Sequence, residues 1–278
     1  MCNERWRLPV SSRPASQARL RRGFGVGLLA VFAFALVLLP VIGLLQRTPW
    51  SSLLNDLSAH DALAALRLSV ETSLGALAFS VVCGVPLAWV LARWDFPGRS
   101  LVRAVVTLPM VLPPVVGGIA LLYAFGRRGF AGTVLFDLTG WRFVFNTSGA
   151  IAAEAFVAMP FLIVTAEAAF RSMDRRPEEA AATLGANPGY RFRRVTLPAV
   201  APALAAGSAL TWARALGEFG ATITFAGNFP GTTQTTPLLV YLDIESGHQA
   251  TALAVSVVLL ALSLAVLVGL RHRWLGSP

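Results

Sequence analysis

The sequence predicts an all-α, polytopic membrane protein with six transmembrane helices. Of its 278 residues, 55% are hydrophobic and only 13% are charged, and the mean hydropathy is +0.65. An average soluble domain has about 25% charged residues. Six apolar stretches are long enough to cross a bilayer, and the basic residues lie beside these stretches instead of forming one basic face.

The six predicted spans follow from length. A helix needs about 20 mostly apolar residues to cross a hydrocarbon core roughly 30 Å thick. We expect spans at residues 23–45, 66–92, 104–125, 148–170, 199–226 and 250–270. The polar stretches between them are too short for a separate soluble domain.

The first span follows a head that is rich in arginine. The apolar run after this head is longer than the ~7–15 residues of a signal peptide, and it lacks a convincing cleavage site. We therefore expect a retained anchor. The predicted organisation is a cytoplasmic arginine-rich tail at 1–22 and a transmembrane domain at 23–278.

The arginines also predict the orientation of the chain. All 23 basic residues are arginine, and with a cytoplasmic N-terminus seventeen of them lie on the cytoplasmic side and five on the other. Short cytoplasmic loops carry such an excess in membrane proteins. We expect a multi-pass protein of the cell membrane, inner or plasma, with both termini in the cytoplasm.

The third predicted span contains an unusual set of helix-disrupting residues. Proline removes backbone hydrogen bonds and kinks a helix. In a bilayer, the freed carbonyls must face neighbouring helices or a water-filled cavity. The interruption indicates either a packing kink or a helix beside a transport pathway. The residues are Pro109, Pro113, Pro114, Gly117 and Gly118.

Several chemistries are excluded by composition. The chain has no lysine, so it can form neither a P-loop nor a Schiff base. Its three histidines are scattered and lack the spacing of a zinc helix. We expect no cofactor in this chain, no metal site and no nucleic-acid partner; if ATP and Mg²⁺ are used, a partner subunit binds them.

The loop at 171–198, between the fourth and fifth spans, is predicted to contain two short helical pieces. Asp174 is suited to cap the first piece, Pro177 to its first turn, and Gly185 to its end. The segment 187–189, Asn-Pro-Gly, favours a turn. By topology this loop is cytoplasmic.

The loop contains Glu179-Ala-Ala, then Gly185 after three residues and Val195-Thr-Leu-Pro after nine more. This pattern resembles the EAA motif of ABC importer permeases, with Val195 in place of the usual isoleucine as the one conservative departure. The resemblance implies the MetI-like permease fold and makes the loop a coupling helix that docks on a cytoplasmic ATPase. An amphipathic loop lying on lipid headgroups is the alternative. The ATPase-coupling residues are Glu179, Ala180, Ala181, Gly185, Val195, Leu197 and Pro198.

The fifth predicted span carries two opposite charges. Arg214 and Glu218 are four residues apart and so would share one helix face. Pairing is expected because either charge alone near the bilayer centre costs about 2.5–3.5 kcal/mol on insertion scales. The pair is either a structural ion pair or part of a gate. Gly217 and Gly220 favour close helix approach.

The segment 213–238 is similar to molybdate permeases and less similar to sulfate and thiosulfate permeases. This resemblance implies an importer of molybdate, with tungstate or sulfate as alternatives. It also implies a homodimer, two cytoplasmic ATPase subunits and an extracytoplasmic oxyanion-binding protein. The candidate pathway or gate residues, which include hydroxyls and an amide able to hydrate a passing oxyanion weakly without holding it, are Arg214, Glu218, Thr222, Thr224 and Asn228.

Two other classes of protein remain as competitors. A secondary transporter would use intramembrane carboxylates such as Glu154, Glu167 or Glu218 as a proton relay. A membrane-embedded enzyme is disfavoured because the chain shows no nucleophile constellation and no histidine cluster. We therefore expect a transport subunit and not an enzyme.

Overall fold

The computed structural model describes residues 16–274, and this part of the chain is helical throughout, with no β-strand. It divides into two units, one ending at Thr48 and the other starting at Pro49. The first unit contains helix α1, Ser16–Arg47, which has Pro40 in its interior. Most of the tail predicted at 1–22 lies outside the described residues, and α1 begins within its last part.

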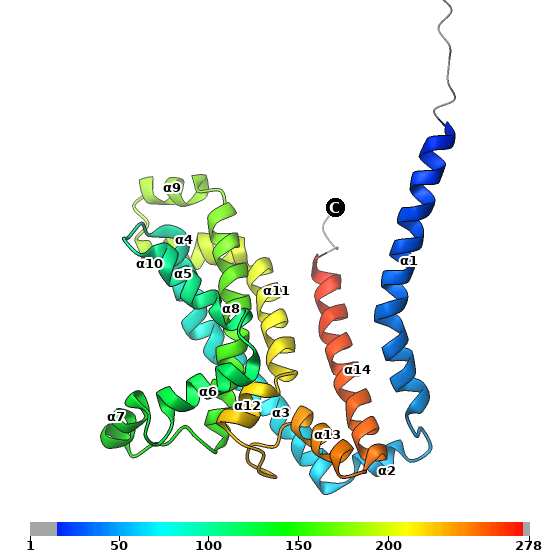
Figure 1. Ribbon diagram of the computed structural model, residues 1–278. Helices are drawn as coiled ribbons and strands as arrows, with labels where there is room; N and C mark the ends of the chain where they lie inside the picture. Colours follow the sequence, from blue (N-terminus) through cyan, green and yellow to red (C-terminus); the bar gives the residue numbers. More distant parts are fainter. Residues whose placement is uncertain (1–15, 275–278) are drawn as a thin grey trace, which may run out of the picture. The chain divides into compact units, whose positions relative to one another are not determined.

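The second unit contains the remaining helices, and α8 (Thr147–Ser172) contacts most of the others (Figure 1). The first half of this unit consists of α2 (Leu53–Leu57), α3 (His60–Phe79), a π-helical turn at Ser80–Gly84, α4 (Val85–Arg93), α5 (Arg99–Thr107), a short 3-10 turn at Leu108–Met110, α6 (Pro114–Phe125) and α7 (Phe130–Thr139).

The second half begins with the loop region and ends with the last span. Its elements are α9 (Arg176–Thr183), α10 (Pro188–Arg191), a π-helical turn at Phe192–Thr196, α11 (Leu197–Leu216), α12 (Gly220–Phe225), α13 (Thr236–Glu245) and α14 (Gln249–Trp274). Helices α9 and α10 lie at one end of the unit, and α7, α12 and α13 lie at the other (Figure 1). We call these the α9 end and the α12 end.

Five helical segments are long and apolar enough to cross a membrane, and a bent pair makes a sixth. The pair consists of Arg99–Met110 and Pro114–Phe125, which meet at 117°. The chain is therefore a multi-pass membrane protein, as predicted. The interruption expected within the span at 104–125 is present and divides it into two helices, because the prolines at 109, 113 and 114 have no amide N–H to continue the helical hydrogen bonds.

The fifth span differs from the prediction at both of its ends. The continuous helical segment runs from Pro188 to Leu216, whereas a span at 199–226 was expected. It stops at Leu216 because Gly217 and the extended turn after it end the helix, and the chain resumes as the separate helix α12 at Gly220. Residues 217–226 therefore do not continue the span.

The core of the second unit combines apolar packing with hydroxyl hydrogen bonds. Three hydroxyls on one face of α3 each contact a different helix: Ser69 bonds Thr236 of α13 at 2.9 Å, Thr72 bonds Glu154 of α8 at 2.8 Å, and Ser73 accepts the Trp212 indole N–H of α11 at 2.9 Å. Such bonds hold helices together where lipid provides no hydrophobic drive. These bonds connect α3 to α8, α11 and α13.

Candidate functional site

Helix α9 is defined at both ends by its sequence. The Arg176 amide donates to Asp174 Oδ1 at 3.1 Å, and Pro177 occupies the first turn. At the other end Gly185 has φ +82°, and the Gly185 and Ala186 amides donate to Ala182 and Ala181 oxygens at 3.0 Å each. This is the Schellman arrangement, which favours glycine. The helix at the start of the predicted coupling loop is confirmed.

One carboxylate fastens α9 to the rest of the unit. Arg93 Nη2, at the end of α4, donates to Glu178 Oε1 at 3.1 Å and lies 3.1 Å from Oε2 as well. The Thr196 hydroxyl donates to the same Oε1. The Arg93 and Glu178 side chains are only 10% and 19% exposed. We call Arg93, Glu178 and Thr196 the Glu178 clamp.

The residues predicted to couple to an ATPase lie mostly outside this clamp. Glu179, Ala180, Gly185 and Pro198 are exposed, while Ala181, Val195 and Leu197 are half-buried. Leu184, at the end of α9, is 87% exposed, an unusual state for a leucine. The structure therefore presents one side of α9 to the surroundings and holds the other against α4 and the start of α11.

Sequence reasoning missed two features of this region. The sequence pointed to Glu179 and not to Glu178, and nothing local distinguishes the two residues. Asn187 was considered only as a turn residue, yet its side chain accepts the Tyr190 amide at 2.8 Å and caps α10. A cap followed by Pro188 at the first helical position is a recognisable helix start, so the sequence did contain a signal for the start of α10.

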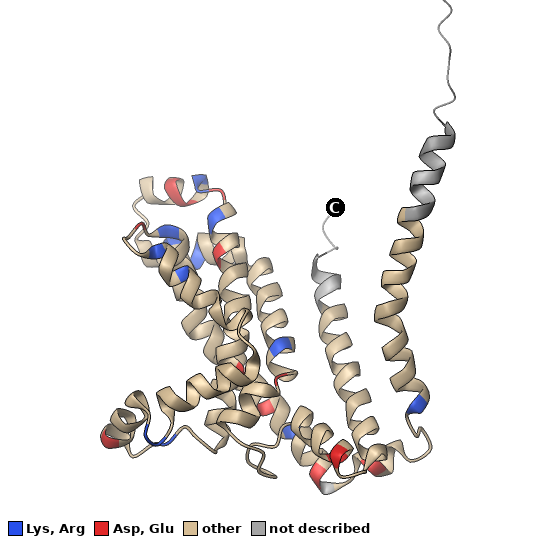
Figure 2. Cartoon of the chain, viewed as in Figure 1, with Lys and Arg blue, Asp and Glu red and all other residues tan. Residues whose placement is uncertain are grey.

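Further ion pairs strengthen the α9 end. Glu167, buried in α8, is bonded by Arg103 of α5 and lies 3.7 Å from Arg171. Arg99 donates from Nε to the Leu91 carbonyl at 2.8 Å and so caps the end of α4. Figure 2 shows basic positions gathered on the elements of this end. The arginines on these elements are Arg93, Arg99, Arg103, Arg171, Arg175, Arg176, Arg191, Arg193 and Arg194.

The second candidate site is the break between α11 and α12. Arg214 Nη1 lies 2.6 Å from Glu218 Oε2, and the Glu218 side chain is 1% exposed. Its other oxygen, Oε1, accepts the Ala221 amide at 2.9 Å. The pair predicted from the four-residue spacing is present, but Glu218 lies after the end of α11 instead of on its face. The carboxylate thus joins α11 to the first turn of α12.

Glycines bring α12 against α6 at close range. A Cβ added to Gly220 would lie 2.9 Å from Pro114 Cβ, and one added to Gly118 would lie 2.9 Å from the Ala221 oxygen. Close approach at Gly220 agrees with the prediction. Gly217 differs, because a Cβ there would meet only the Ala213 oxygen of its own helix, at 3.7 Å. Gly217 ends α11 and does not pack against a neighbour.

The three remaining pathway candidates lie on α12 and just after it. Thr222 is buried, and its Oγ1 has no hydrogen-bond partner among the described residues. The Thr224 hydroxyl donates to the Gly220 carbonyl at 2.7 Å. Asn228 is half-buried, and its buried Oδ1 likewise lacks a partner in the described chain. The structure brings all five candidates to one region around the break.

Glu154 is a buried carboxylate in the same region. It is 2% exposed, and its Oε1 accepts the Thr72 hydroxyl at 2.8 Å. Its Oε2 has no hydrogen-bond partner among the described residues, and the Glu218 charge is close enough to act on it. An intramembrane carboxylate of this kind is a candidate functional group by default. It was named in the sequence only as part of a possible proton relay.

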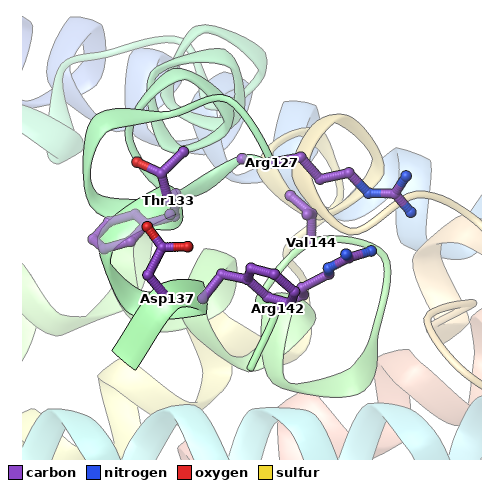
Figure 3. A pocket seen from close by; sticks show the side chains of 9 residues that line it. Arg127, Thr133, Asp137, Arg142 and Val144 are labelled. Carbon is purple, nitrogen blue, oxygen red and sulfur yellow. The ribbon is translucent and has the colours of Figure 1, made fainter. Parts of the chain in front are cut away.

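A surface cavity of about 300 Å³ lies near α7 at the α12 end. Thr133 and Asp137 of α7 line one side, and the guanidinium groups of Arg127 and Arg142 point away from them (Figure 3). Arg142 Cζ lies 4.4 Å from the centre of the Phe136 ring. The cavity carries both signs of charge, in contrast to the basic α9 end.

This arrangement places the chain in a known class of membrane subunit. Residues 84–276 match the family of binding-protein-dependent transport system inner membrane components, and the chain belongs to this family. The family includes permease subunits of transport systems, which agrees with the predicted permease class.

Individual relatives indicate which kind of permease the chain is similar to. The chain is 42% identical over 248 residues to the molybdenum transport system permease protein ModB of Mycobacterium bovis, covering 89% of this chain and 93% of the relative. It is 42% identical to ModB of Escherichia coli K12 over 76% of this chain and 92% of the relative. It is 36% identical to the sulfate transport system permease protein CysT of Salmonella typhimurium, with 94% of each chain covered.

Solved structures support the fold. A bacterial ABC transporter that imports the acidic polysaccharide alginate matches with a TM-score of 0.75 at 19% identity, over 92% of this chain and 95% of the other. The MetNI methionine ABC transporter, in an inward-facing form, matches with a TM-score of 0.57 over 76% and 93%. The predicted MetI-like all-helical permease fold is confirmed.

Proposed function

We propose that this chain is the membrane permease subunit of an ATP-driven, binding-protein-dependent importer of molybdate. The observation that carries the coupling role is the Glu178 clamp, which holds α9 on the unit while leaving Glu179 and Leu184 exposed. A short rigid helix fastened on one side can pass a rigid-body push to the spans. The names of the ModB relatives support molybdate as cargo.

The α9 end faces the cytoplasm in this proposal. Its elements carry nine of the sixteen arginines between Pro49 and Trp274, and the positive-inside rule places such an end on the cytoplasmic side. Both termini are then cytoplasmic. The α12 end faces outward, where a binding protein delivers the anion near Arg214 and Asn228.

The partners follow from the coupling geometry. One chain provides one α9, so an assembly with two ATPase subunits takes two copies of the permease. ATP and Mg²⁺ bind to the ATPase subunits. Similar structures support such partners, since the alginate importer was solved in complex with a periplasmic protein carrying an alginate pentasaccharide. Lipid surrounds the spans.

Uptake measurements test the energy source. Cells expressing the complete transporter should lose molybdate uptake when ATP is depleted and retain it when an uncoupler dissipates the proton gradient. The reverse pattern would favour a proton-driven transporter that uses Glu154, whose buried Oε2 is the observation behind that alternative. Competition of sulfate and tungstate with molybdate uptake measures which anion is preferred as cargo. A preference for sulfate would overturn the assignment of molybdate as the cargo.

Docking variants test the coupling role. Replacing Glu179 by arginine should leave the chain in the membrane but reduce co-purification of the ATPase at least about fivefold, the size of a lost interfacial charge contact. Asp137→Arg, an exposed acid at the opposite end, is the matched control. Replacing Gly185 by valine should act in the same direction, because φ +82° is strained for a β-branched residue. Normal co-purification in both variants would contradict the proposal.

A further inference from the structure

A second cavity lies at the joint between α9 and the rest of the unit. Its volume is about 300 Å³, at the lower limit of ligand pockets. It is lined by side chains from the end of α4, from the start of α9 and from α10. The residues that matter here are Trp89, Arg93, Trp94, Arg175, Glu178 and Arg191.

The cavity contains positive charge that no carboxylate of the described chain neutralises. Glu178 is already bonded by Arg93 and Thr196. Arg175 and Arg191 form no ion pair with any residue between 16 and 274. In addition, Arg191 Nε is buried and has no hydrogen-bond partner within that range. A buried guanidinium N–H without a partner is costly and indicates an acceptor from outside the chain.

The walls of the cavity are aromatic. The Trp89 ring meets the Trp94 ring edge-on with centroids 6.0 Å apart, and it meets the Phe192 ring in the same manner at 5.9 Å. Trp94 itself is 55% exposed. Tryptophan is enriched at the depth of lipid headgroups, and Trp89 and Trp94 lie at the end of an apolar segment that runs to Arg93. The cavity therefore lies at the level where a bilayer presents phosphate.

We propose that this cavity binds a phosphate-type oxyanion, supplied by the headgroup of an anionic phospholipid or by free phosphate. Guanidinium groups match phosphate oxygens with two parallel N–H bonds. Basic pockets between spans on the cytoplasmic side take anionic headgroups. The anion would bridge Arg175, just before α9, and Arg191 in α10, beside the Glu178 clamp. It would thereby stiffen the joint through which α9 acts.

The proposal rests on the proposed function only for the cytoplasmic placement of this end, and binding is measured without transport. The full-length chain is reconstituted in nanodiscs of phosphatidylcholine alone or with phosphatidylglycerol. Native mass spectrometry after release counts the retained phosphatidylglycerol. In the nanodiscs without anionic lipid, equilibrium dialysis with radiolabelled inorganic phosphate measures binding of the free anion.

The variants are Arg175→Gln, Arg191→Gln and their combination, with Arg194→Gln as the control, because Arg194 is exposed on the same segment and does not line the cavity. Each cavity variant should weaken anion binding about fivefold and the double variant about 25-fold, as expected for roughly 1 kcal/mol per arginine. The control should match the wild type. Gel filtration verifies that each variant keeps its fold.

The outcomes separate the sources of the anion. Loss of phosphatidylglycerol in the cavity variants alone supports a lipid headgroup, and loss of phosphate binding alone supports a free anion. An equal effect in Arg194→Gln, or no binding of either probe to the wild type, overturns the proposal. Neither result would bear on ATP-driven molybdate uptake, which is read out in cells, so failure of the two proposals is distinguishable.

Discussion

The α9 end and the α11–α12 break both contain an ion pair, but they hold it in different surroundings. At the α9 end, the Glu178 carboxylate is partly exposed and joins a surface helix to the unit. At the break, Glu218 is 1% exposed and α12 packs against α6 with no room for a Cβ at Gly118 or Gly220. The first arrangement leaves a helix accessible to a partner, whereas the second holds α12 closely against the end of α11 and against α6.

Removing Arg214 should have the largest effect. Arg214→Ala leaves the Glu218 carboxylate buried without its counter-charge, which destabilises a protein by about 3–5 kcal/mol. Thermal unfolding of the purified chain in detergent should show a clear drop in midpoint. Arg67→Ala is the control, because its pair with Glu71 has exposed side chains and should change little.

The double variant Arg214→Ala with Glu218→Gln should recover much of this loss, since the uncompensated charge at position 218 is then removed. If Arg214→Ala and Arg67→Ala unfolded at the same temperature, the contrast between a buried and an exposed pair would be wrong.

Glu178→Ala should have an intermediate effect confined to α9. The clamp loses its charge-assisted hydrogen bonds, each worth about 1.5–3 kcal/mol, while the spans keep their packing. Limited trypsin digestion with peptide mapping should show faster cleavage after Arg175, since the bond after Arg176 precedes Pro177 and resists trypsin. Glu179→Ala removes an equally charged but exposed neighbour and should not increase cleavage. Equal cleavage in the two variants would show that Glu178 does not fasten α9.

The contrast between the two regions also explains what could be predicted from sequence. The spans and the start and end of α9 depend on local signals: apolar runs, an early proline and a terminal glycine. The break at 217–219 was missed because the apolar residues on either side of it continue the hydropathy of the span, and the four-residue spacing of Arg214 and Glu218 favoured one continuous helix. The inward direction of Glu178, and not of Glu179, depends on Arg93, which is 85 residues earlier in the chain.

Two helices were missed although they carried partial signals. Helix α13 begins after Thr235, an acceptable cap, with Pro237 in its first turn, yet no helix was predicted between the spans at 199–226 and 250–270. The structure buries Thr233, Thr235 and Thr236 at its start. Helix α7 is apolar but only 10 residues long, too short for a search based on membrane thickness.

The smallest predicted effect concerns the cap of α10. Asn187→Ala removes the acceptor of the Tyr190 amide, which costs about 1 kcal/mol of local stability. Hydrogen exchange of the peptide that covers 188–192 should become about fivefold faster. Asn55→Ala, in the exposed part of α2, should leave this peptide unchanged. Unaltered exchange in Asn187→Ala would mean that the contacts of the adjoining π-helical turn, and not the cap, hold this segment.

The three hydroxyl bonds of α3 bear on how freely the unit can change shape. A hydrogen bond between membrane helices contributes about 0.6 kcal/mol on average, so the bonds of Ser69, Thr72 and Ser73 together amount to about 2 kcal/mol. That corresponds to a population ratio of roughly 30 to 1. A conformer in which α3 has exchanged these partners would therefore make up a few per cent of the molecules at equilibrium. A modest binding free energy supplied from outside the membrane would be enough to raise its population.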